Sequence, residues 1–176
     1  MDDEPSRPKL RSLDELDVNM LHFARESRGY KEILYDSSPL YVRLPPAKTP
    51  QGVTSFAAKR YLTMTADRVN FASLQHWVDT VAEGEAQSIV RDGVLKIRMK
   101  MEDNEFVGGV FDAARQPTGL DAIVPGARVH CIAQISAVWE MGSANTAKSG
   151  LLIDAMQILI EPTSPGCKIV DDDDPY

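Results

Sequence analysis

The sequence predicts a mostly β protein: a small antiparallel barrel with one inserted helix, preceded by an amphipathic helix. Several short segments alternate apolar and polar residues, while only one internal segment has a helical period. A parallel sheet needs a crossover connection between its strands, usually a helix, so one internal helix favours antiparallel pairing. With 176 residues and 43% hydrophobic residues, the chain suits one globular core and excludes a coiled coil, a collagen-like chain or a wholly disordered protein.

The N-terminal segment predicts an arm followed by a helix. Residues 1–11 are polar and contain proline, which is typical of a mobile arm. Ser12 to Glu15 has the form of a capping box, in which the Ser hydroxyl and the Glu carboxylate satisfy free backbone N–H groups. Apolar residues follow at helical spacing, at Leu13, Leu16, Met20 and Phe23. We therefore predict an amphipathic helix over 13–27, ended by Gly29, within an N-terminal region of residues 1–29.

The next part of the chain has the period of strands. We expect strands at 30–35, 40–44 and 59–65. In the second of these, three aliphatic residues alternate with Tyr41 and Arg43, which places those two side chains on the opposite face. Residues 45–52 contain three prolines, which cannot donate to a sheet, and they predict a loop.

The one internal helix is expected after Asp67, whose side chain can cap its first turn. Its apolar residues recur at helical spacing: Phe71, Leu74, Val78 and Val81. Gly84 is expected near its end.

The clearest strand covers residues 94–101, where every second residue is apolar and the residues between them are Lys96, Arg98 and Lys100. Further strands are expected at 106–111, 128–139 and 151–160, with a turn at Pro125-Gly126 and a loop at 141–150. Seven short strands with one inserted helix favour an OB-like barrel, which we place at residues 30–161.

Catalytic and metal-binding motifs are absent from the sequence. The three histidines, His22, His76 and His130, are far apart and follow no metal-binding spacing, and the two cysteines form no CxxC pair. There is no P-loop, GxGxxG or GxSxG. We therefore expect a binding protein without catalytic activity, metal or cofactor. The acidic N-terminus and the strand-length apolar runs predict a soluble, intracellular chain without a signal peptide or membrane span.

The basic face of strand 94–101 is the best candidate for a binding site. Lys96, Arg98 and Lys100 form a ladder with steps of roughly 7 Å, comparable with the phosphate spacing of an extended single strand. Other candidate contacts are the cations Arg43, Lys48, Lys59, Arg60 and Lys148 and the aromatic residues Tyr41 and Trp139, with Phe56 and Tyr61 as further stacking candidates. The alternative is a solvated outer face whose charges protect the strand from aggregation.

The net charge of −7 is unevenly distributed. Residues 30–170 hold fourteen basic and fifteen acidic side chains, whereas residues 171–176 hold four acidic ones and no basic one. This tail, Asp171, Asp172, Asp173, Asp174, Pro175 and Tyr176, ends a flexible region expected at 162–176. It is a solubilising end, a peptide ligand whose ring fills a partner's pocket, or a polyanion that folds back over the chain's own basic face.

Two resemblances bear on function. The stretch from Leu40 to Val53, the later Val110-Phe111-Asp112 and the segment 135–139 are similar to OB-fold proteins of large nucleocytoplasmic DNA viruses, of which an asfarvirus member binds single-stranded DNA. Gln51 stands where that family has a Phe in a Pro-Phe-Gly turn. The last six residues resemble the tails of bacterial and phage single-stranded DNA-binding proteins, with Tyr in the last place.

Together these resemblances imply sequence-independent binding of single-stranded DNA in viral DNA replication or repair, at replication sites in an infected cell. The tail would regulate binding and recruit replication or repair proteins, and the chain would act without a membrane, with homo-oligomerisation left open. The alternative function is a structural or scaffolding protein of a virion or replication complex that makes protein contacts only. The near-neutral charge of residues 30–170 favours this alternative.

Overall fold

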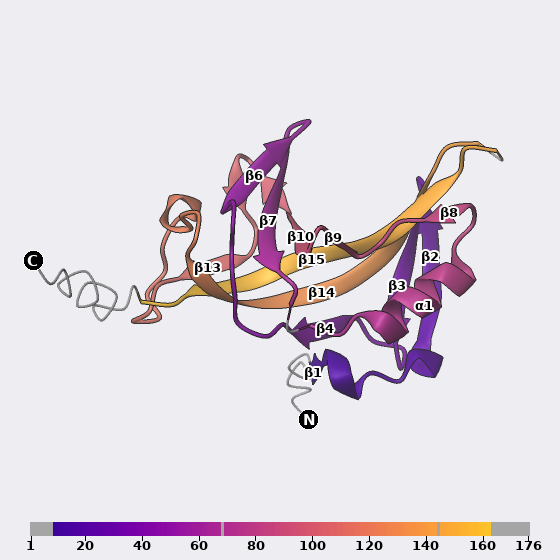
Figure 1. The fold of residues 1–176 in the computed structure, drawn as a ribbon, viewed down its shortest axis with the longest axis horizontal. Helices are drawn as coiled ribbons and strands as arrows, with labels where there is room; N and C mark the ends of the chain where they lie inside the picture. Colours follow the sequence, from indigo (N-terminus) through magenta and orange to yellow (C-terminus); the bar gives the residue numbers. More distant parts are fainter. Residues whose placement is uncertain (1–8, 68, 144, 163–176) are drawn as a thin grey trace, which may run out of the picture.

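A long curved hairpin forms the centre of the structure (Figure 1). The computed structural model describes residues 9–67, 69–143 and 145–162. Strands β14 (Arg128–Met141) and β15 (Lys148–Ile160) pair antiparallel along nearly their whole length. The register shifts between Ile132 and Ala133 and again between Ile135 and Ala137. Such bulges increase twist and bend a sheet, which agrees with the curved hairpin in Figure 1.

Strands on both sides of this hairpin extend it into one sheet, and β11 (Met101–Glu102) and β12 (Glu105–Phe106) pair separately as a two-stranded sheet. On the β14 side lie β4 (Leu40–Arg43), β3 (Tyr30–Tyr35) and the short β5 (Ala47–Lys48), all antiparallel to it. On the β15 side lies β10 (Val94–Met99), which pairs antiparallel with β7 (Lys59–Thr65). The remaining strands are β1 (Leu10–Ser12), β2 (Leu21–Ser27), β6 (Val53–Phe56), β8 (Glu85–Ala86), β9 (Val90–Arg91) and β13 (Gly109–Phe111).

The sheet remains open. Its main order is β1-β4-β14-β15-β10-β7-β6, and within the described residues the two outer strands β1 and β6 pair with their inner neighbours only. The predicted mostly β fold with an inserted helix is confirmed, and the open order is consistent with a partly open OB-like barrel. The predicted strands at 30–35, 40–44, 59–65, 94–101, 128–139 and 151–160 are all present, with ends shifted by a few residues.

The core fills one side of this sheet. Alternate residues of the central strands point into it, and Ile97, Ile135 and Val42 have no accessible surface. Helix α1 (Ala72–Val81) lies against the core through Leu74 and Val78, which are also buried. The helix begins later than expected from Asp67: its N-cap residue is Phe71, and the Asn70 side chain accepts a hydrogen bond from the Ala72 N–H at 3.0 Å. None of the helices in the described residues has the length and apolar character needed to cross a membrane.

The predicted helix over 13–27 is wrong. That segment consists of two single-turn 3-10 helices, η1 (Leu13–Glu15) and η2 (Val18–Met20), followed by strand β2. Strand β2 pairs antiparallel with β3 through a turn at Arg28 and Gly29, where φ is +51° and +80°. Two consecutive positive φ angles suit a two-residue hairpin turn, so the glycine expected to end a helix instead reverses a strand.

Candidate nucleic-acid interface

The sheet face opposite the core gathers aromatic and basic side chains from separate strands. Residues directly paired in neighbouring strands point to the same face. Arg98 of β10 pairs with Tyr61 of β7 and with Asp154 of β15. Across β14, Gln134 connects Asp154 to Tyr41 of β4. The surface defined by these pairs is called the outer face.

The outer face continues toward the end of the long hairpin. Gly150 lies four residues before Asp154 in β15 and therefore shares its face. Trp139 is the partner of both Gly150 and Tyr30. The outer face therefore carries four aromatic residues, which come from β3, β4, β7 and β14: Tyr30, Tyr41, Tyr61 and Trp139.

Trp139 lies directly over the backbone of β15. A Cβ atom at Gly150 would fall 2.6 Å from Cε2 and Cζ2 of the indole and 2.7 Å from its Nε1. Only glycine permits this approach, which places the ring against the strand. The indole remains partly accessible, because Trp139 is half-buried.

The basic side chains of the outer face differ in how they are held. Lys96 is exposed, and its Nζ lies 5.3 Å from the centre of the Tyr61 ring. Arg98 is held by Asp154 through two hydrogen bonds, from Nε to Oδ1 at 2.6 Å and from Nη2 to Oδ2 at 3.0 Å. Arg43 is exposed and lies opposite Ile132 of β14. Of the predicted ladder, Lys96 and Arg98 therefore share this face within β10, Arg98 is already paired with Asp154, and Lys100 lies beyond the end of the strand.

A second basic cluster lies at the opposite end of β14. Lys48 is exposed and pairs with Arg128 across β5 and β14. Arg128 Nε lies 3.2 Å from Glu161 Oε2, and His130 Nε2 lies 2.7 Å from Glu161 Oε1. One carboxylate thus faces two neighbouring side chains, whereas Lys48 has no ion pair among the described residues.

Three other predicted contacts lie toward the edges. Lys59 is exposed and pairs with Phe56 at the tip of the β6–β7 hairpin, where 71% of Phe56 is accessible. Lys148 is exposed two residues before Gly150. Lys100 is exposed just beyond the last residue of β10.

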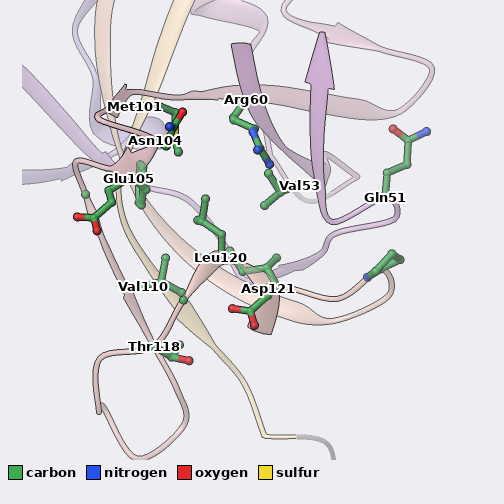
Figure 2. Close-up of a pocket in the computed structure, with 15 residues that line it drawn as sticks. Gln51, Val53, Arg60, Met101, Asn104, Glu105, Val110, Thr118, Leu120 and Asp121 are labelled. Carbon is green, nitrogen blue, oxygen red and sulfur yellow. The ribbon is translucent and has the colours of Figure 1, made fainter. Parts of the chain in front are cut away.

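Arg60 is separate from these residues. It pairs with buried Met99 and therefore points away from the outer face. It lines a pocket of about 760 Å³. In Figure 2 its side chain reaches toward Val53, with Leu120 and Asp121 on the opposite wall. This pocket lies between the edge strand β6 and the segment after β13, where the sheet does not close.

Several residues of the outer face were missed by sequence reasoning. Tyr30 was placed in the correct strand but not proposed as a contact, and Arg128 and His130 were not proposed either. Asp154 carries no local signal, because its role depends on a partner 56 residues away. The side-chain chemistry offers stacking surfaces and cations, and the described residues contain no cluster of three or more possible metal ligands.

The predicted tail contacts Asp171, Asp172, Asp173, Asp174, Pro175 and Tyr176 lie outside the described residues.

Comparisons with known proteins give a distant structural likeness. No protein-family model matches the sequence, and no curated protein matches it. A C-terminal truncation of the single-stranded DNA-binding protein from bacteriophage Enc34 has a TM-score of 0.47 and 10% identity, covering 84% of this chain and 98% of that chain. The same phage protein in complex with single-stranded DNA has a TM-score of 0.45 and 11% identity, covering 82% and 96%.

A likeness at this level carries no inference about what this chain binds. The resemblance to proteins of large nucleocytoplasmic DNA viruses stays a prediction.

Proposed function

We propose that this chain binds single-stranded DNA without sequence preference on the outer face. The observation that supports it best is the gathering of Tyr30, Tyr41, Tyr61 and Trp139 with exposed cations on one side of a curved sheet. Aromatic rings can stack on any base, and cations can bind the phosphates that link successive nucleotides. The pattern therefore suits a ligand that has phosphates and unpaired bases.

The geometry favours a single strand over a duplex. In a duplex the bases are stacked on one another, so their faces are closed to aromatic side chains. The aromatic residues of the outer face are supplied by strands and not by a protruding helix that would enter a major groove. The exposed cations Lys96, Arg43, Lys59 and Lys48 would accompany the backbone along this face.

The proposal extends to a role in viral DNA replication or repair. The tail from Asp171 to Tyr176 would recruit replication or repair proteins and compete with DNA for the basic side chains. Its four carboxylates and terminal aromatic ring have the chemistry of a peptide ligand for a basic pocket.

The test is a fluorescence-anisotropy titration of a labelled oligo-dT at several salt concentrations. The substitution Lys96→Gln removes one exposed cation and is expected to weaken binding and to reduce the slope of log K against log salt by about 0.7, the value for one phosphate contact on a single strand. The matched control is Arg115→Gln, an exposed cation in the loop after β13 and outside the strands that supply the aromatic residues of the outer face.

Equal effects of the two substitutions would contradict a site on the outer face. Wild-type protein that does not bind oligo-dT at low salt would overturn the proposed function and favour the scaffolding alternative. Duplex of the same length serves as competitor, and it should displace the labelled strand only weakly. A single-stranded RNA of the same length, used as a second competitor, shows whether binding depends on the sugar.

A further inference from the structure

Arg98 is held more closely than the exposed basic residues of the outer face. Asp154 holds its guanidinium from one side through both carboxylate oxygens, at 2.6 and 3.0 Å. The Ser136 hydroxyl donates a hydrogen bond of 2.7 Å to Oδ2 of the same carboxylate. The side chain of Asp154 is 12% accessible and that of Arg98 is 28% accessible. Two hydrogen bonds to a buried carboxylate fix the planar guanidinium in one orientation.

This arrangement removes most of the net charge at the centre of the face. Burial acts to lower the pKa of Arg98, but the hydrogen bond and the negative charge of Asp154 more than offset it, so the pKa is raised. Arg98 therefore remains a cation, and its charge is balanced by a carboxylate in contact with it. A phosphate placed against Arg98 would also lie close to that carboxylate, and the two negative charges would repel each other.

Two tyrosine rings lie near Arg98 in addition to Asp154. Tyr61 is its direct partner in β7, Tyr30 lies close enough to act on its pKa, and Trp139 pairs with Tyr30 farther along the same face. Within the described residues, the hydrogen bonds of the guanidinium use Nε and Nη2, which leaves Nη1 free to donate. A free donor edge and a planar cation among aromatic rings match the carbonyl groups and the flat faces of nucleobases.

We propose that Arg98, oriented by Asp154 and Ser136, forms a subsite for a nucleobase at the centre of the outer face. The phosphates of the same strand are then left to the exposed lysines. This proposal rests on the proposed function. It specifies which part of the DNA each cation contacts, a base at Arg98 and phosphates at the exposed lysines.

The test compares two variants on two probes. The double variant Arg98→Gln/Asp154→Asn removes both charges together, so that neither partner is left as an unpaired buried ion. The second variant is Lys96→Gln. The probes are oligo-dT and an oligonucleotide of equal length whose central positions are abasic. Each is titrated across a range of salt concentrations, and thermal melting checks that the variants are folded.

The double variant is expected to bind oligo-dT about 5- to 150-fold more weakly, the loss of one base contact, with an unchanged salt slope. On the abasic probe its deficit should disappear. Lys96→Gln is expected to lower the salt slope and to keep its deficit on the abasic probe, because it loses a phosphate contact.

Two results would overturn the subsite while leaving the proposed function standing. A lower salt slope with a deficit that persists on the abasic probe would place a phosphate at Arg98. Unchanged affinity for oligo-dT would make the ion pair a purely structural link between β10 and β15. Wild-type protein without affinity for oligo-dT would overturn the proposed function itself.

If the double variant does not fold, Arg98→Lys supplies the same test. It keeps the charge and removes the planar fork, so weaker binding at an unchanged or larger salt slope supports the subsite. Unchanged binding contradicts it.

Discussion

The contact between Trp139 and Gly150 means that a substitution at Gly150 can displace the indole ring, which is one of the proposed stacking surfaces. The Cβ of Gly150→Ala would lie 2.6 Å from two carbon atoms of the indole, closer than real carbon atoms approach. Gly150 lies inside β15 and has no left-handed φ, so its backbone accepts alanine without strain. The indole ring must therefore move away from β15, whereas the backbone of β15 can stay in place.

The expected effect follows from the value of one stacked base. Stacking of a base on an aromatic ring contributes about 1–3 kcal/mol, so losing this platform should weaken binding of oligo-dT by about 5- to 150-fold. The salt slope should not change, because no cation is altered.

The assay has two readouts. Fluorescence anisotropy gives the affinity, and tryptophan emission reports the ring itself in a Trp77→Phe background, where Trp139 is the only remaining tryptophan. The control is Ser149→Ala at the neighbouring position. Ser149 is buried and its hydroxyl has no hydrogen-bond partner in the described part of the chain, so its removal should leave affinity and emission unchanged.

Two results would contradict the proposed stacking role of Trp139. Unchanged emission from Gly150→Ala would show that the indole does not lie against Gly150. Shifted emission with unchanged affinity would show that Trp139 is not a stacking surface for the ligand.

Two further predictions concern the tail and the core. Deleting residues 171–176 should tighten binding of oligo-dT at low salt, because a competing polyanion is removed, and the gain should vanish at high salt; equal affinities at low salt would argue against competition. Burial raises the pKa of the Cys131 thiol to about 12, so Cys131 should resist iodoacetamide at pH 8 in the folded protein and react in denaturant, as followed by peptide mass spectrometry; rapid labelling of the folded protein would contradict the burial.

Local alternation predicted most of the strands. In residues 94–99, apolar residues that fill the core alternate with residues of the outer face, and the period of two was sufficient to place them. The helix predicted in the N-terminal segment was wrong because the apolar spacing there also fits two single turns followed by a strand. Pairing with β3 decided between these structures, and such pairing has no signal within residues 13–27.

The site was only partly predictable for a related reason. Residue types and alternation identified Lys96 and Tyr41 as members of an exposed face. The meeting of Tyr30, Tyr61 and Trp139 depends on strand order and register, which local patterns do not specify. The register also separates residues that are adjacent in sequence, since Lys59 and Arg60 point to opposite faces of β7.

Photo-crosslinking shows whether single-stranded DNA lies on the outer face. An oligo-dT strand containing 5-iodouracil is bound and irradiated, and the crosslinked peptides are identified by mass spectrometry. We predict crosslinks at Tyr30, Tyr41, Tyr61 or Trp139. Crosslinks confined to helix α1 or to the pocket around Arg60, or no crosslinked complex at low salt, would contradict this prediction.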